Sequence, residues 1–177
     1  MEQSLRYAGL KENDIVDGEG VCVSFWVQGC CHWHRCDGCH NPDTWDINGG
    51  LELPNTYVDD IIRLLSKNGI QRNLSILGGE PCLDSNVSIV LPLVKKVHTE
   101  VKFSKIYLWS GFTFEELLQR DNTKELLQYI DVLVDGRFEL EHRDITLKFR
   151  GSPNQRVIDV QKSLSSGKVV LYYIESR

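Results

Sequence analysis

The residues with the clearest chemical potential are cysteines and histidines gathered in one short segment. They are Cys30, Cys31, His32, His34, Cys36, Cys39 and His40. Thiolates are soft ligands, and several of them on one loop can surround a metal without ligands from distant parts of the chain. The segment therefore predicts a metal centre or a redox site.

Three kinds of site fit these residues. A structural zinc ion needs four cysteine or histidine ligands, and the segment contains more than four. An iron–sulfur cluster takes thiolates almost exclusively. The pair Cys36 and Cys39 also has the two-residue spacing of a redox-active dithiol. Zinc knuckles usually come in separated pairs, whereas His98 and His142 are isolated.

A second motif, Gly78-Gly79-Glu80-Pro81, follows the apolar run Leu74–Leu77. A tight turn at the end of a strand is its simplest interpretation. Paired glycines also let the backbone approach a small ligand closely, and their carbonyl groups can then accept hydrogen bonds from it. The motif is therefore a candidate ligand-binding turn.

The elements that must position these motifs alternate between strand and helix. The predicted strands cover residues 21–27, 74–77, 106–109 and 132–134, with weaker candidates at 146–149 and 169–173. The predicted helices cover residues 55–67, 87–101, 114–119 and 124–129, with Pro92 starting or kinking the second. Repeated strand–loop–helix order predicts an α/β fold with a mostly parallel sheet. Both motifs directly follow predicted strands, where such folds bind ligands.

The bulk composition narrows the function classes. The 177 residues suit a single domain, 1–177, and the net charge of −5 argues against nucleic-acid binding. The apolar runs are too short to span a membrane, and the N-terminus has no signal-peptide pattern. Six cysteines without an export signal favour metal or redox use over disulfides. We therefore expect a cytoplasmic protein.

Taken together, the motifs resemble the radical S-adenosylmethionine superfamily, and within it the activating proteins of anaerobic ribonucleoside-triphosphate reductase. The resemblance covers nearly the whole chain in order. It runs through residues 14–20, 36–45, 77–81, 108–112, 134–138 and 150–156. One departure is the cysteine spacing, because five residues separate Cys30 from Cys36 where the family pattern has three. The longer loop costs only about 0.5 kcal/mol of closure entropy if it is flexible.

The resemblance implies a fold, a set of cofactors and a set of site residues. The fold would be an open partial (βα) barrel of the radical S-adenosylmethionine type. One 4Fe–4S cluster would be held by Cys30, Cys36 and Cys39, with Cys31 as the alternative to Cys30. The open fourth iron would bind S-adenosylmethionine. The residues expected at this cofactor are Gly38, Cys39, His40, Gly78, Gly79 and Glu80.

The resemblance also implies a reaction and partners. A 5′-deoxyadenosyl radical would remove hydrogen from a glycine of the large reductase subunit, after flavodoxin or another low-potential donor reduces the cluster. Two alternatives stay open at this stage. One is a radical enzyme acting on a small molecule, as 7-carboxy-7-deazaguanine synthase does. The other is a non-catalytic zinc-binding interaction module.

Overall fold

The computed structural model describes residues 5–31 and 35–174. His32 and His34, two of the candidate zinc ligands, lie outside the described residues. The strands are β1 (Arg6–Asp14), β2 (Cys22–Val27), β3 (Leu51–Glu52), β4 (Asn73–Gly78), β5 (Ile106–Trp109), β6 (Val132–Asp135) and β7 (Arg156–Asp159). The helices are α1 (Tyr57–Leu65), α2 (Asp84–Glu100), α3 (Phe114–Leu118), α4 (Asp121–Leu127) and α5 (Val160–Ser166). Short 3₁₀ turns span Pro42–Thr44, Lys67–Gly69 and Leu140–His142.

All seven of these strands form one sheet, in the order β3-β1-β2-β4-β5-β6-β7. The central strands β2, β4, β5 and β6 are parallel, while β1, β3 and β7 join antiparallel at the two edges. The predicted α/β fold with a mostly parallel sheet is confirmed for these central strands. Parallel order brings their carboxyl ends to one edge, so the loops that follow β2 and β4 lie side by side.

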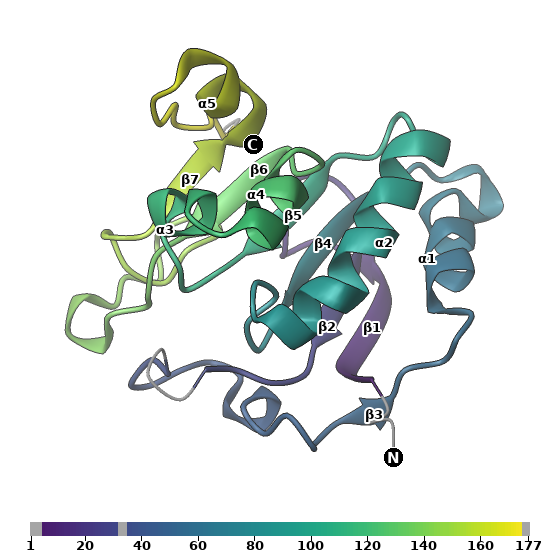
Figure 1. Cartoon of the computed structure of the whole chain (residues 1–177), viewed down its shortest axis with the longest axis horizontal. Helices are drawn as coiled ribbons and strands as arrows, with labels where there is room; N and C mark the ends of the chain where they lie inside the picture. The colour runs from purple at the N-terminus through teal and green to yellow at the C-terminus, as the bar shows by residue number, and fades with distance from the viewer. Residues whose placement is uncertain (1–4, 32–34, 175–177) are drawn as a thin grey trace.

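Helices α1 to α4 cover one face of the sheet (Figure 1). The main core lies between them, and it includes Phe25, Ile76 and Leu108 from the strands. Ile61, Leu93 and Leu117 from the helices are fully buried against these side chains. Most residues of the four central strands are buried on either face, and most of them are apolar. Helix α2 begins before the predicted residue 87, so Pro92 lies inside the helix rather than in its first turn.

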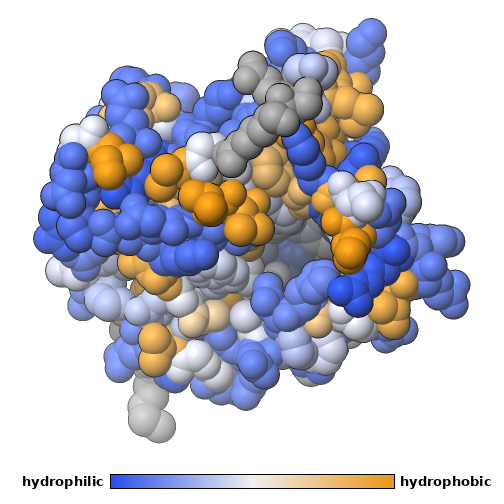
Figure 2. All heavy atoms as spheres, turned by 180° about the vertical axis from the view of Figure 1, so that it is seen from behind, coloured by the Kyte–Doolittle hydropathy of each residue, from blue (hydrophilic) through white to orange (hydrophobic). Residues whose placement is uncertain are grey.

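The opposite face of the sheet carries a smaller cluster and no helix from α1 to α4. Tyr107, Val132, Val134 and Val157 form its buried part. The partly buried residues packed against them are Trp109, Phe149, Tyr172 and Ile174. Figure 2, which views the molecule from behind, shows that this face is hollowed and that hydrophobic residues border the hollow. In the part of the chain that the structure describes, no helix is long and apolar enough to span a membrane.

Several predicted elements need correction. Residues 146–149 form turns and bends rather than a strand, because the Asp144 carboxylate accepts hydrogen bonds from the backbone and hydroxyl of Thr146. Residues 169–173 contribute only an isolated bridge between Leu171 and Ile158. Strands β1 and β7 and helix α5 were not predicted. Strand β1 is mixed in polarity and only its last residue is buried, so its sequence lacks the apolar alternation of a buried strand.

Candidate functional site

A cavity of about 540 Å³ opens at the carboxyl ends of β2, β4, β5 and β6. Trp26, Leu77, Trp109 and Val134 line it from the strands. The loops contribute Val16, Asp17, Cys36, Cys39, His40, Asn41, Gly78, Gly79, Ser110, Gly111, Gly136, Phe138, Leu147, Phe149, Arg150, Gly151 and Gln155. Ligand pockets usually measure about 300–1,000 Å³, so the cavity has room for a nucleoside-sized molecule.

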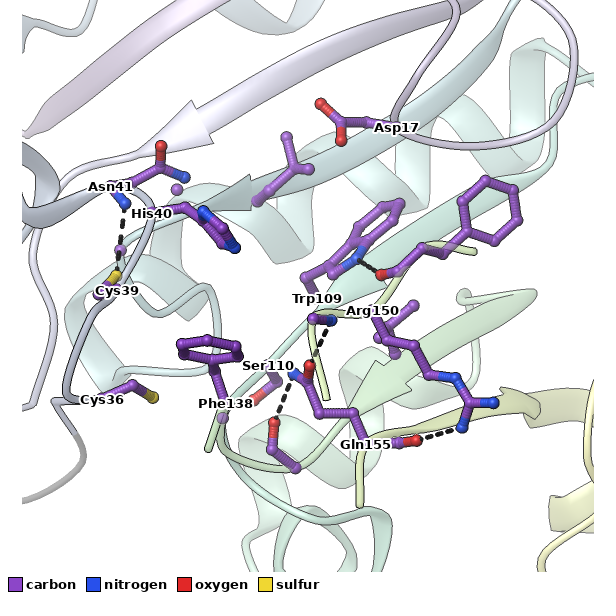
Figure 3. Close-up of a pocket in the computed structure, with 18 of the residues that line it drawn as sticks. Asp17, Cys36, Cys39, His40, Asn41, Trp109, Ser110, Phe138, Arg150 and Gln155 are labelled. Carbon is purple, nitrogen blue, oxygen red and sulfur yellow. Dashed lines mark hydrogen bonds between the residues drawn. The ribbon is translucent and has the colours of Figure 1, made fainter. Parts of the chain in front are cut away.

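The cysteine loop forms one wall of this cavity (Figure 3). A turn closes it, in which the backbone N–H of Cys39 donates to the Cys36 carbonyl at 3.1 Å. The Cys39 sulfur accepts a hydrogen bond from the Asn41 N–H at 3.4 Å. Gly38 has a φ of +68°, and a Cβ there would lie 2.8 Å from a Leu140 methyl group. The predicted residues Gly38, Cys39 and His40 therefore share one turn, with Cys39 and His40 facing the cavity.

Cys30 and Cys31 face different surroundings. The pKa of Cys30 rises to about 12, because of burial and because Glu80, Cys31, Cys36 and Cys39 are close enough to act on it. Burial and Glu80 also raise the pKa of Cys31, but the other groups acting on that thiol include Arg120 and Asp84. Neither Cys36 nor Cys39 is among the principal groups acting on Cys31. Of the two thiols, Cys30 is therefore the one whose pKa the other loop cysteines raise.

Within residues 5–31 and 35–174, no three histidine, cysteine, aspartate or glutamate side chains converge closely enough to hold a metal ion. The loop nevertheless has the chemistry of a cluster site. Its donors are thiols, which iron–sulfur clusters require, and two of them border a cavity.

The two glycines at the end of β4, Gly78 in its last position and Gly79 directly after it, are required by close backbone packing. Gly78 has a φ of +116°, and a Cβ there would lie 2.4 Å from the Val27 carbonyl oxygen. A Cβ on Gly79 would lie 2.1 Å from the Gly29 carbonyl oxygen. Any larger residue would push the β4 turn away from the loop that follows β2. The glycines therefore keep the turn and the cysteine loop in contact at the cavity wall.

Glu80 lies beneath the cavity wall instead of lining it. Its carboxylate accepts hydrogen bonds at 2.8 Å from the Cys82 N–H, the Ser110 hydroxyl and the Gly111 N–H. Burial raises the pKa of Glu80, and these three bonds oppose that shift. The side chain therefore joins the turn after β4 to the turn after β5. The sequence indicated that Glu80 belongs to the site but not that its carboxylate points into the protein.

Sequence reasoning did not assign a role to the acidic pair Asp14 and Asp17. Asp14 is buried, yet hydrogen bonds from Val16 and Ser24 help to lower its pKa to about 2. Burial and the neighbouring Asp14 raise the pKa of Asp17 to about 6. Asp17 lines the cavity, so a carboxyl group with a raised pKa borders the candidate site. The only signal was the position of both residues in the motif at 14–20.

The segment from Arg150 to Arg156 forms the wall across from the cysteine loop (Figure 3). Gln155 organises it, since its side-chain oxygen accepts from the Gly151 N–H at 2.8 Å and its amide donates to the Gly136 carbonyl at 3.0 Å. Arg156 pairs with both Asp135 and Glu115. From the sequence alone, a polar surface loop was the simplest expectation for this segment, and binding of a carboxylate or of the partner was the alternative. It is instead tied to the end of β6 and builds part of the cavity.

Comparison with known proteins agrees with this geometry. Residues 16–158 match the family described as a 4Fe-4S single cluster domain. The chain is 43% identical to the anaerobic ribonucleoside-triphosphate reductase-activating protein of Vibrio cholerae, over 80% of this chain and 90% of that protein. It is 37% identical to the protein of the same name from Escherichia coli K12, over 81% and 92%. The phage T4 protein of that name is 34% identical, over 86% and 93%.

These matches span both the cysteine loop and the Gly78-Gly79 turn that share the cavity wall. The identities exceed those at which only a fold is shared, and they extend over most of each relative. The 4Fe-4S description also agrees with the thiol-rich donor set of the loop. The chain therefore belongs to the 4Fe-4S single cluster domain family and, within it, to the anaerobic ribonucleoside-triphosphate reductase-activating proteins.

Proposed function

We propose that this protein activates an anaerobic ribonucleoside-triphosphate reductase by radical S-adenosylmethionine chemistry. One observation carries the proposal: Cys36 and Cys39 border the same cavity as the backbone turn Gly78-Gly79. Thiols that can hold an iron–sulfur cluster thus lie beside a turn that a small molecule can approach closely. Family membership supplies the partner, since relatives are named as activating proteins of this reductase.

The loop cysteines have the principal cofactor-binding role in this proposal. Cys30, Cys36 and Cys39 would ligate the cluster, and the surroundings of Cys30 support it over Cys31 as the first ligand. Three cysteine ligands would leave the cluster able to bind S-adenosylmethionine as well. When bound, the cluster and S-adenosylmethionine supply a 5′-deoxyadenosyl radical that removes a hydrogen atom from a glycine.

The remaining wall residues position the cofactor and exclude water. Gly38 and His40 would flank it on the cysteine side, and the Gly78-Gly79 backbone would bind its methionine moiety. Glu80 would act indirectly, because its carboxylate joins the two turns that form the wall. Trp26 and Trp109 give the cavity apolar sides. The Trp109 indole N–H donates to the Phe149 carbonyl at 2.7 Å, which fixes the ring in place.

The proposal extends to the architecture and the cellular setting. We infer an open partial (βα) barrel formed by one domain, 1–177, because the parallel strands end at a single cavity on an open sheet. The partner would be the large reductase subunit, and flavodoxin or a similar low-potential protein would reduce the cluster. A cytoplasmic location suits a site that depends on reduced thiols.

The proposal is tested by reconstituting the protein with iron and sulfide under anaerobic conditions and reducing it. With S-adenosylmethionine and the reductase present, it should release 5′-deoxyadenosine and methionine and generate a glycyl radical signal on the reductase. Cys36→Ala should abolish both products. Cys22→Ala is the matched control, because Cys22 is buried on β2 away from the loop and should leave both intact.

Three results would contradict the proposal. Tightly bound zinc with no iron or sulfide after reconstitution would indicate the interaction module. Turnover of a small metabolite without any radical on the reductase would indicate a different substrate class. A cluster that forms while neither S-adenosylmethionine cleavage nor the glycyl radical occurs would also reject the activase function.

A further inference from the structure

The cavity has a charged group that the proposed cofactor does not use. Figure 3 shows Arg150 on the side of the cavity away from Cys36, Cys39 and His40. In the proposed function, the cluster and S-adenosylmethionine would be held on the cysteine side of the cavity, and the adenosine moiety would carry no negative charge. Arg150 lines the opposite side, so it would lie next to the part of the cavity that remains for the substrate.

Arg150 is held in a defined position by its own segment. One guanidinium nitrogen, Nη1, donates to the Gln155 carbonyl at 2.7 Å. Gln155 is itself fixed by its side-chain bonds to Gly151 and Gly136. The guanidinium is thus oriented before any ligand arrives, so binding orders little additional structure. Its other N–H groups stay available to a ligand in the cavity.

The positive charge of Arg150 has no counterpart in the part of the chain that the structure describes. No carboxylate there lies within ion-pair distance of it, and Asp17, which lines the same cavity, makes no ion pair with it. Arg156, six residues later, shows the contrast, because it pairs with Asp135 at 2.5 Å and with Glu115 at 2.7 Å. In a chain with a net charge of −5, a half-buried arginine without a carboxylate partner indicates a ligand-binding role.

Apolar side chains line the same cavity as this charge. Leu147 and Phe149 precede Arg150 on the same wall, and Val16 lines the cavity beside Asp17. Val16 is 69% exposed and its neighbour Ile15 is 65% exposed, so both side chains present apolar surface that a partner could cover. A ligand complementary to these apolar side chains and to Arg150 would have apolar side chains next to one negative charge. Phosphates or sugars alone would leave the apolar groups in water.

We propose that Arg150 binds a carboxylate on the reductase segment that carries the target glycine. This inference rests on the proposed function and adds the chemistry by which the partner segment is recognised. The guanidinium and the carboxylate form a charge-assisted, two-pronged pair, which fixes orientation as well as affinity. Apolar residues of the segment pack against Val16, Leu147 and Phe149. The ion pair with Arg150 fixes how deeply the target glycine enters the cavity. The carboxylate belongs either to an acidic side chain or to a chain terminus.

The test measures the dissociation constant of the reconstituted protein for the reductase under anaerobic conditions. Arg150→Gln should weaken binding by about 10-fold or more, as expected for loss of a charge-assisted pair. Arg143→Gln is the matched control, because Arg143 is exposed nearby and its loss changes the net charge equally. It should bind like the wild type. Arg150→Lys keeps the positive charge but cannot form the two-pronged hydrogen bond, so its dissociation constant should lie between those of the wild type and Arg150→Gln.

Peptides spanning the reductase glycine identify the source of the carboxylate. They compete with the reductase for the wild type, and replacing the relevant Asp or Glu by its amide, or amidating the terminus, should weaken competition about 10-fold. The same replacement should have little effect with Arg150→Gln. If Arg150→Gln does not fold, as judged by thermal melting, Arg150→Lys and the peptides still decide the question.

The outcomes separate this inference from the proposed function. If the wild type neither binds nor activates the reductase, the proposed function fails and the role of Arg150 fails with it. If the wild type binds and activates the reductase but Arg150→Lys and Arg150→Gln bind equally well, only the role of Arg150 is wrong. Peptides without any carboxylate that compete as well as the parent peptide would also overturn it.

Discussion

Replacing Asp17 with asparagine should stabilise the protein at neutral pH. The pKa of Asp17 is about 6 in the folded protein, because of burial and the adjacent Asp14, against 3.8 for an unperturbed aspartate. The difference of about two pH units corresponds to about 3 kcal/mol, at about 1.4 kcal/mol per unit. Since Asp17 is partly exposed, water reduces this to about 1–3 kcal/mol.

The sign follows from the direction of the shift. A raised pKa means that the folded protein holds the proton more tightly, so the stabilising contribution is complete below pH 3.8 and is lost as the pH rises through about 6. Asparagine keeps the neutral form at every pH. Asp17→Asn should therefore exceed the wild type in free energy of unfolding by about 1–3 kcal/mol at pH 8, and the difference should approach zero at pH 4.

Urea denaturation of both proteins between pH 4 and pH 8, in the same state of metal loading, measures this difference. Asp14→Asn is the informative control, because the pKa of Asp14 is lowered to about 2 and its charged form is stabilised by Ser24 and Val16. That variant should be less stable than the wild type at pH 8. The reasoning about this acidic pair is refuted if Asp17→Asn is no more stable than the wild type at pH 8, or if its advantage does not depend on pH.

Other substitutions test the cavity wall. Gly79→Ala places a methyl group 2.1 Å from the Gly29 carbonyl oxygen, so it should lose about 3 kcal/mol or more of stability in urea denaturation. Wild-type stability would contradict the close packing. Glu80→Gln turns an amide N–H₂ toward groups that donate to this carboxylate, and it should lose about 1–3 kcal/mol. An unchanged denaturation midpoint would argue against a stabilising role for the hydrogen bonds of the buried Glu80 carboxylate. Cys30→Ala should abolish iron incorporation whereas Cys31→Ala should retain it, as measured by iron and sulfide analysis, and the reverse result would exchange their roles.

The parts of the fold that the sequence predicts are those whose local pattern and tertiary environment agree. Ile106–Trp109 is a short apolar run between polar loops, and the structure has a strand with the same bounds. Residues 146–149 have a similar composition but follow Asp144. The Asp144 carboxylate accepts a hydrogen bond from the Thr146 backbone N–H, which holds this segment in a turn. Strand β1 pairs with β2 and β3 through backbone hydrogen bonds. Backbone pairing does not require apolar side chains at alternate positions, so the sequence of β1 gives no strand signal.

The candidate site divides in the same way. Cysteine spacing and the paired glycines identify both halves of the wall, because each motif is local in the chain. The direction in which Glu80 points is not local, since Ser110 and Gly111 lie thirty and thirty-one residues away. The raised pKa of Asp17 and the absence of a carboxylate partner for Arg150 among the described residues likewise depend on which segments the sheet brings together. Those relations arise only once the topology is known.

The most direct test of the account is spectroscopy of the anaerobically reconstituted and reduced protein with and without S-adenosylmethionine. If Cys30, Cys36 and Cys39 hold a 4Fe–4S cluster with one iron open to the cavity, adding S-adenosylmethionine should shift the electron paramagnetic resonance spectrum of the reduced cluster. A cluster whose spectrum is the same with and without S-adenosylmethionine, or a protein that takes up no iron, would contradict the account.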